Sequence, residues 1–306
     1  MLLAALLSSC SDTQKQNDGK LNVVSTVFPS YDFSRQIGED KINLTLLIPP
    51  GGESHTYEPT PSDIIKIKNA DVFLYTGGEN DTWVKNVLDD VGSEHTAVVA
   101  MMDCVETVEE EHVEGMQVYE HEHEHGEDEE HEKDEHVWTS PINAIKISRV
   151  IAETFAEKDK ENAEFYKNNF LEYEKELKQL DSDIRNVVDN AQRHTLIFGD
   201  RFPLRYFADE YGLEYFAAFP GCSAESEPSA KTVSFLIDKV RQEKIGVVFY
   251  LEFSNGKCAQ TIAEESGAKT LLFHSCHNVT QDEMKRGETY ISLMRKNLEN
   301  LKIALN

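Results

Sequence analysis

The order of strands, loops and helices in the first part of this chain returns in its second part. Residues 48–51 (Ile-Pro-Pro-Gly) correspond to residues 219–221 (Phe-Pro-Gly), and residues 72–75 (Val-Phe-Leu-Tyr) correspond to residues 247–250 (Val-Val-Phe-Tyr). In both halves, short apolar strands alternate with amphipathic helices, which is typical of parallel sheets covered by helices. The sequence therefore predicts an α/β protein with two similar, doubly wound lobes.

A long helical pattern lies between the two repeats. Between residues 162 and 190, apolar side chains recur at helical spacing in a highly charged background, at Phe165, Phe170, Tyr173, Leu177, Leu180, Ile184, Val187 and Val188. A helix of this length can join two lobes as a rigid strut. We therefore divide the folded chain into an N-terminal lobe (residues 21–157), a linking helix (158–190) and a C-terminal lobe (191–306). A duplicated α/β pair of this kind is expected to bind a ligand in the crevice between its lobes, outside the carboxyl ends of the strands.

Residues 120–136 consist almost entirely of Glu, Asp and His, and Glu and His alternate over residues 120–125. Because this stretch has no apolar side chains to bury, we expect it to belong to a disordered loop of the N-terminal lobe, residues 106–135. Imidazole and carboxylate are both zinc ligands, so the composition favours metal capture over a merely solvated acidic loop. A mobile tract cannot build a precise site, which predicts a better-ordered metal site elsewhere in the chain.

The charge balance argues against several kinds of partner. The formal net charge is −26, and residues 106–136 hold fifteen acidic residues and one lysine. Nucleic acids and anionic membrane surfaces would repel a chain this acidic, whereas cations are attracted to it. We therefore expect a cationic ligand and no nucleic-acid partner.

The first ten residues are apolar and end in Ser-Ser-Cys. They resemble the end of a bacterial lipoprotein signal peptide with Cys10 as the lipidated residue, and the alternative is a frayed apolar N-terminus. We assign residues 1–20 to a signal remnant and a polar linker. This stretch is too short to span a bilayer as a helix, and no other segment of the sequence is apolar enough to do so.

Four cysteines remain besides Cys10, namely Cys104, Cys222, Cys258 and Cys276. An extracytoplasmic location permits disulfides, and four cysteines allow three pairings. Cys222 and Cys276 both lie in polar loops that follow strands, which makes them our first choice for a bridge. The alternative is that the thiols are buried and free.

Candidate metal ligands lie just after predicted strands or just before predicted helices. His55 lies in the loop after the second strand, and His136 ends the acidic loop. Asp200 follows the first strand of the second half, and His274 and His277 follow its last strand. An isolated loop histidine is more often a surface residue than a ligand, but these positions all point to one crevice. The sequence has no compact zinc spacing such as Cys-x-x-Cys or His-Glu-x-x-His, which argues against a zinc finger or a zincin protease.

Two segments resemble motifs of a known family. Residues 52–63 (Gly-Glu-Ser-His-Thr-Tyr-Glu-Pro-Thr-Pro-Ser-Asp) and residues 135–141 (Glu-His-Val-Trp-Thr-Ser-Pro) are similar to two ligand motifs of the metal-binding solute-binding lipoproteins of ABC transporters, the zinc/manganese class. The His/Glu-rich loop ahead of the second motif is typical of the zinc-specific members of that class. The resemblance covers nearly the whole chain from Leu21 onward.

The resemblance implies a four-ligand metal site in the cleft between the lobes. Its ligands would be His55, His136, Asp200 and His274. His277 lies close enough in sequence to complete the site in place of Asp200. The resemblance also implies that Glu252 is a buried carboxylate behind the ligands, although Glu252 could equally be a structural partner of a helix terminus.

The sequence thus predicts an extracytoplasmic protein that captures Zn²⁺ and hands it to an ABC transporter permease. Three imidazoles with one carboxylate favour zinc over manganese, which prefers oxygen ligands. A closed shell of four ligands leaves no position for an activated water, so we expect no enzymatic activity. We expect a monomer that is anchored through lipid on Cys10 to the outer face of the cell membrane. Because histidine binds metal without its proton, zinc affinity should fall as the pH drops through about 6.

Other functions compete with this one. The chain could bind manganese or another divalent metal, act as a surface adhesin, or buffer metal through its His-rich loop. It could also be a zinc-dependent hydrolase with Glu58 or Glu225 as general base, but the sequence holds no helix-borne ligand pair with a base. Deleting residues 112–135 separates transport from buffering, because a transport protein would keep one tight site without the loop.

Overall fold

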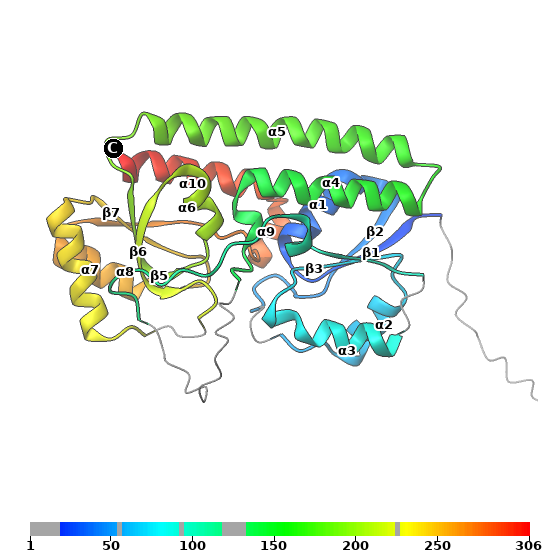
Figure 1. The fold of residues 1–306 in the computed structure, drawn as a ribbon, viewed down its shortest axis with the longest axis horizontal. Coiled ribbons are helices and arrows are strands. Elements are labelled where there is room, and N and C mark those ends of the chain that lie inside the picture. The colour runs from blue at the N-terminus through cyan, green and yellow to red at the C-terminus, as the bar shows by residue number, and fades with distance from the viewer. Residues whose placement is uncertain (1–18, 54–56, 92–94, 118–132, 224–226) are drawn as a thin grey trace, which may run out of the picture.

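Two α/β lobes lie side by side and are joined along one side by long helices (Figure 1). The N-terminal lobe is on the right of Figure 1, the C-terminal lobe is on the left, and α5 (Ala163–Asp189) runs above both. The predicted fold class, two similar doubly wound lobes with a long linking helix, is confirmed. The computed structural model describes residues 19–53, 57–91, 95–117, 133–223 and 227–306.

The N-terminal lobe is built on a parallel sheet with the strand order β2-β1-β3-β4. Its strands are β1 (Leu21–Ser25), β2 (Ile42–Leu46), β3 (Val72–Tyr75) and β4 (Ala97–Ala100). Its helices are α1 (Phe28–Gly38), α2 (Pro61–Lys68), α3 (Thr82–Val91) and α4 (Pro141–Lys158). β4, a short strand at the edge of the sheet, was not among the strands expected from the sequence.

The C-terminal lobe repeats this arrangement with the order β6-β5-β7-β8, again parallel. Its strands are β5 (Thr195–Phe202), β6 (Glu214–Pro220), β7 (Val247–Tyr250) and β8 (Lys269–Leu272). Its helices are α6 (Arg205–Tyr211), α7 (Ala230–Glu243), α8 (Lys257–Ser266), α9 (Gln281–Arg286) and α10 (Tyr290–Leu305). Short 3₁₀ turns complete the fold at Glu39–Lys41, Glu79–Asp81, Met102–Cys104 and Val137–Thr139. The last of these, η4, lies directly after His136.

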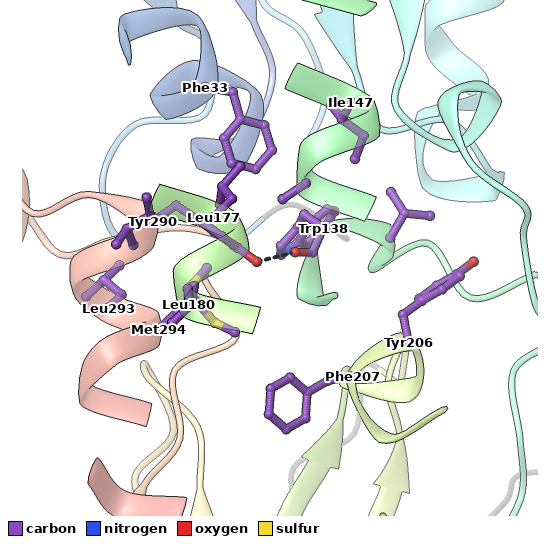
Figure 2. Close-up of a cluster of buried hydrophobic side chains, with 14 of the residues drawn as sticks. Phe33, Trp138, Ile147, Leu177, Leu180, Tyr206, Phe207, Tyr290, Leu293 and Met294 are labelled. Carbon is purple, nitrogen blue, oxygen red and sulfur yellow. Dashed lines mark hydrogen bonds between the residues drawn. The ribbon is translucent and has the colours of Figure 1, made fainter. Parts of the chain in front are cut away.

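One hydrophobic core is shared by the two lobes along α5. This helix has 27 residues and buries one face, whose members are three or four positions apart: Tyr166, Phe170, Tyr173, Leu177, Leu180, Ile184 and Val188. It packs against α4 and α1 from the N-terminal lobe and against α10 from the C-terminal lobe. Figure 2 shows this shared core, where Phe33, Leu177 and Tyr290 lie close together. The core therefore fixes how the two lobes sit relative to each other.

Each lobe also has a smaller core on the other face of its sheet. In the N-terminal lobe, Ile67 and Phe73 belong to this outer core, beside α2 and α3. In the C-terminal lobe, Leu236, Val248 and Ile262 belong to it, beside α7 and α8. Both sheets are thus covered on two faces, as doubly wound sheets require.

The helix boundaries follow from local sequence signals. Thr60 caps α2 through a capping box with Asp63, and Pro61 occupies the first helical turn, where its missing N–H costs nothing. Gly212 ends α6 in the left-handed conformation, with φ of 63°, which favours glycine. Both features are signals that can be recognised in the sequence itself.

Residues 105–117, which we call the strap, cross from the N-terminal lobe to the C-terminal lobe. The Val108 amide donates to the Tyr206 hydroxyl at 3.2 Å, and the Gln117 amide donates to the Ala218 carbonyl at 2.9 Å. Apolar strap side chains pack against the shared core, namely Val105, Val108, Val113 and Met116. The predicted disordered loop included most of the strap, because the acidic background obscured these apolar positions. The His-rich residues 118–132 lie outside the described residues.

The expected disulfide between Cys222 and Cys276 is absent, because Cys104, Cys222, Cys258 and Cys276 are free. Burial raises the pKa of both the Cys222 and the Cys276 thiol, which keeps them protonated and unreactive. Cys10 lies outside the described residues. In the described ranges, no helix combines the length and the apolar character that crossing a membrane requires.

Candidate metal centre

A small cavity lies between the lobes, at the carboxyl ends of the strands. Its volume is about 40 Å³, enough for roughly three water-sized spheres. The N-terminal lobe lines it with Gly52, Glu53 and His136. The C-terminal lobe lines it with Arg201, Pro203, Gly221, Leu251, Glu252, Phe253, Ser275, His277 and Asn278. This is where the duplicated α/β pattern predicted a ligand site.

His136 enters the cavity from the turn that precedes α4, and its side chain is 1% exposed. The Asp134 carboxylate accepts a hydrogen bond from the His136 amide at 2.8 Å and lies 3.1 Å from Nδ1 of the ring. An Nδ1–H that donates to Asp134 puts the lone pair on Nε2, which is the tautomer that a metal ion needs. Burial is the largest single influence and lowers the pKa of His136, but the nearby carboxylates of Asp134, Glu135 and Glu110 together hold the pKa above its ordinary value.

The backbone of the C-terminal lobe approaches the His136 ring closely at Gly221. A Cβ atom added to Gly221 would lie 3.3 Å from Cε1 of His136 and 3.0 Å from the Phe202 carbonyl oxygen. Glycine is therefore favoured at Gly221, where the chain after β6 packs tightly against the histidine of the other lobe.

His277 faces His136 from the loop after β8. The two ring centroids are 5.5 Å apart and the rings are nearly perpendicular, at 89°. Trp138 lies against both rings, with its centroid 4.9 Å from that of His277 and 5.5 Å from that of His136. Its indole N–H donates to the Ser275 carbonyl at 2.9 Å. One buried tryptophan thus links the segments that carry the two histidines.

His274, one of the expected ligands, is buried beside the cavity but does not belong to its lining in the described residues. Its Nδ1 accepts a hydrogen bond from the Cys276 amide at 2.9 Å, and its Nε2 lies 3.8 Å from the Glu283 carboxylate. The Asn297 amide binds both the N–H and the C=O of His274. His274 Nε2 is buried without a hydrogen-bond partner among the described residues, and the side chain stays outside the described cavity lining.

Asp200, another expected ligand, does not belong to the described cavity lining. Its carboxylate accepts hydrogen bonds from the Leu251 amide at 3.2 Å and from the Arg201 amide at 2.9 Å. The pairing of β5 with β6 shifts register between Phe198 and Arg201. Such a bulge re-aims side chains, and here Arg201 lines the cavity.

Two carboxylates complete the described lining. Glu252 follows β7 and accepts hydrogen bonds from the backbone amide and the hydroxyl of Ser275, so it both lines the cavity and holds the loop that carries His277. Glu53 forms an ion pair with Arg201, with 3.7 Å between Oε2 and Nη2. His55, also an expected ligand, lies outside the described residues, two positions after Glu53.

The cavity lining thus includes His136 and His277, which were candidates from the sequence, and also Glu53 and Arg201, which were not. The available signal for Arg201 was its position directly after Asp200, in the segment that follows the first predicted strand of the second half. In the described ranges, no group of three or more His, Cys, Asp or Glu side chains is close enough to hold a metal ion. The imidazoles and carboxylates that face the cavity nevertheless have the donor chemistry of a zinc site.

Known proteins resemble the chain over nearly its whole length. A family model described as "Zinc-uptake complex component A periplasmic" matches residues 23–304. The chain is 36% identical over 309 residues to the high-affinity zinc uptake system protein ZnuA of Bacillus subtilis, covering 100% of this chain and 94% of that protein. It is 34% identical over 307 residues to the zinc-binding lipoprotein AdcA of Streptococcus pneumoniae, covering 98% of this chain and 59% of AdcA. The chain thus spans little more than half the length of AdcA.

Solved structures agree with this assignment. The Zn(II)-bound ZnuA-like domain of S. pneumoniae AdcA superposes with a TM-score of 0.77 at 30% identity, covering 94% of this chain and 99% of that domain. The metal-dependent lipoprotein YcdH of B. subtilis superposes with a TM-score of 0.79 at 32% identity, covering 94% and 99%. With a family match that spans both lobes, the chain belongs to the family of periplasmic A components of zinc-uptake complexes.

Proposed function

We propose that this chain captures Zn²⁺ in the cavity between its lobes and delivers it to the permease of an ABC transporter. The observation that carries the proposal is the pair of imidazoles, His136 and His277, that face one small cavity from opposite lobes. Zinc is the cargo in this proposal. The names of the B. subtilis and S. pneumoniae relatives, which refer to zinc uptake and zinc binding, support it.

We infer a ligand set that differs in part from the set expected from the sequence. His136 would bind through Nε2, with its ring oriented by Asp134, and His277 would bind from the other lobe. His55 stays in the set on the strength of its motif, since the neighbouring Gly52 and Glu53 line the cavity. A carboxylate of the cavity wall, from Glu53 or Glu252, supplies the oxygen ligand in place of Asp200.

The competing functions have less support. The family is a component of zinc-uptake complexes, so the chain is not an enzyme. Of the two candidate bases of a hydrolase, Glu58 is exposed and does not belong to the described cavity lining, and Glu225 lies outside the described residues. Manganese would favour a site richer in oxygen ligands than one with two facing imidazoles.

The location we propose is extracytoplasmic, in keeping with the periplasmic family description. Lipid on Cys10 would hold the monomer at the outer face of the cell membrane. Replacing Cys10 with serine should release the protein from the membrane fraction, which radiolabelled lipid incorporation and cell fractionation would detect. Retention in the membrane at wild-type level would contradict the lipid anchor.

Zinc titration against a competing chelator tests the ligand set. His136→Ala and His277→Ala should each weaken the tight site by more than about 100-fold, since even losing a partner of a ligand costs about 10- to 100-fold. His274→Ala and Asp200→Ala should have smaller effects. His194→Ala is the matched control, because His194 is exposed at the start of β5, at the opposite end of the sheet from the cavity. A large loss in His274→Ala with none in His277→Ala would restore the original assignment.

Replacing residues 118–132 with a Gly/Ser linker of equal length separates transport from buffering. The linker keeps the strap, which the wider deletion of 112–135 would cut. One tight zinc site should survive, with fewer weak sites beside it. Loss of the tight site would mean that the His-rich stretch supplies its ligands.

A further inference from the structure

Arg201 places a permanent positive charge in a cavity that we propose to hold a divalent cation. In the described lining of the cavity it is the one Lys or Arg side chain, and a guanidinium keeps its proton at any physiological pH. Its side chain is 25% exposed, so solvent screens its charge incompletely. A zinc-binding cavity gains nothing from an inward cation by itself, which calls for an explanation.

The fold holds this guanidinium in place from two sides. The register shift in β5 after Phe198 brings Arg201 to the cavity, while the neighbouring Asp200 turns to the Leu251 amide. One guanidinium nitrogen, Nη1, donates to the Ser223 carbonyl at 3.1 Å within the C-terminal lobe. A second nitrogen, Nη2, lies 3.7 Å from the Glu53 carboxylate of the N-terminal lobe. Arg201 therefore spans the two lobes at the cavity and neutralises one of the carboxylates that zinc would use.

We propose that Arg201 is the residue that sets zinc affinity and release, by acting as a built-in competitor of the metal. When the cavity is empty, the guanidinium neutralises Glu53 and links the lobes. When Zn²⁺ enters, the ion competes with Arg201 for that carboxylate and is repelled by the guanidinium. Binding is weaker and release is faster than the imidazoles and carboxylates alone would give. This inference rests on the proposed function, because it takes Zn²⁺ as the occupant of the cavity.

The same guanidinium could instead attract a small anion that completes the zinc coordination shell. The two roles predict effects of opposite sign when the charge is removed. If Arg201 competes with zinc, removing its charge makes zinc bind more tightly. If Arg201 holds an anion that coordinates zinc, removing its charge makes zinc bind more weakly. We favour the competitor role because Glu53 already lies at ion-pair distance from the guanidinium.

The test compares Arg201→Gln and Arg201→Lys with the wild type in the full chain. Zinc affinity is measured by chelator competition, and zinc release by stopped-flow mixing with excess chelator. Arg201→Gln should bind zinc at least about tenfold more tightly and release it correspondingly more slowly, whereas Arg201→Lys, which keeps the charge, should stay near the wild type. Arg193→Gln is the control, because Arg193 precedes β5 at the end of the sheet away from the cavity.

A double-mutant cycle with Glu53→Gln guards against an indirect structural effect of Arg201→Gln. If Arg201 acts by competing for Glu53, the gain from Arg201→Gln should shrink when Glu53 is already neutral. Unchanged or weaker zinc binding in a folded Arg201→Gln variant would overturn the inference. The His136→Ala variant in the same series keeps the two hypotheses apart. If it retains wild-type affinity, the proposed site has failed, and if it loses affinity while Arg201→Gln gains none, the failure belongs to the Arg201 inference alone.

Discussion

The two lobes share a strand order but differ at the strand ends that form the cavity. β1 has five residues and pairs with β2 without a register shift, whereas β5 has eight residues and carries a bulge where it pairs with β6. The repeated order follows from the same alternation of apolar strands and amphipathic helices in both halves. The bulge changes only which side chains leave the sheet, and so it gives the C-terminal lobe an inward arginine. Duplication thus supplies the scaffold, and local irregularity supplies the difference at the site.

The lobes also depend on each other through the core that they share along α5. This dependence can be tested at Trp138, which is fully buried. The indole N–H of Trp138 donates to the Ser275 carbonyl. The backbone carbonyl of Trp138 accepts a hydrogen bond from the Tyr290 hydroxyl (Figure 2). Trp138→Ala should lower the free energy of unfolding by about 3–5 kcal/mol. Urea unfolding followed by circular dichroism measures the loss. Trp83→Ala is the control, because Trp83 is half-buried and packs against the outer core of the N-terminal lobe. An equal loss of unfolding free energy in this variant would mean that the shared core contributes no more to stability than the outer core.

The close packing of β5 against α8 can be probed at Gly199, beside the bulge. A Cβ atom added to Gly199 would lie 2.4 Å from Cα of Ala259, so backbone must move. Gly199→Ala should destabilise the protein by about 1–3 kcal/mol through overpacking. Gly246→Ala in the same lobe meets nothing within 4 Å and should be neutral or slightly stabilising. Thermal melts of both variants measure the difference. Equal melting temperatures would show that α8 moves away from the added methyl group without a cost in stability.

The strap can be loosened from the C-terminal lobe at Tyr206. Its hydroxyl accepts from the Val108 amide and donates to the Asp134 carbonyl at 2.7 Å, so it holds both ends of the segment that leads to His136. Tyr206→Phe should cost on the order of 1.5 kcal/mol and expose the Val108 amide to hydrogen exchange. Tyr173→Phe is the matched control, because its buried hydroxyl has no hydrogen-bond partner in the described part of the chain. That variant should be neutral or stabilising, and similar losses in both would contradict the assignment.

The smallest expected effect on the free energy of unfolding comes from the N-terminal caps of α2 and α7, which lie at corresponding positions of the two lobes. Burial raises the pKa of Asp63, but hydrogen bonds from Thr60 and Lys66 outweigh it and lower the pKa from 3.8 to about 2. Because the folded pKa is depressed, this carboxylate stabilises α2 above about pH 4, and the contribution is lost as the pH falls toward 2. The cap of α7 is neutral, because the Ser229 hydroxyl accepts a hydrogen bond from the Thr232 backbone amide.

Asp63→Asn should therefore cost about 1 kcal/mol at pH 7 and progressively less below pH 4. Ser229→Ala, which removes the hydroxyl that caps α7, should give a loss that does not vary with pH. Urea unfolding of both variants between pH 7 and pH 2.5 provides the measurement. A flat profile for Asp63→Asn would show that its carboxylate carries no net cap energy.

Much of the fold could be predicted because its signals are local. Thr60 with Pro61 marked the start of α2, Gly212 marked the end of α6, and helical spacing from Phe165 to Val188 marked α5. Each of these depends on neighbours within a few positions, where propensity, capping and periodicity act. The strap escaped prediction because its few apolar residues are stabilised by the other lobe, which no local pattern reveals.

The sequence by itself determined that the chain has two α/β lobes, a linking helix and a histidine-bearing crevice at the strand ends. The tertiary structure alone decided which side chains face that crevice. His274 and His277 are three positions apart in one loop, and their orientations depend on Asn297, Glu252 and Trp138, which are distant in sequence. Arg201 and Asp200 are adjacent, and a single extra residue in the pairing with β6 decides which of them enters the cavity. Side-chain direction at a strand end is set by long-range contacts, because one added residue reverses it without altering the local pattern.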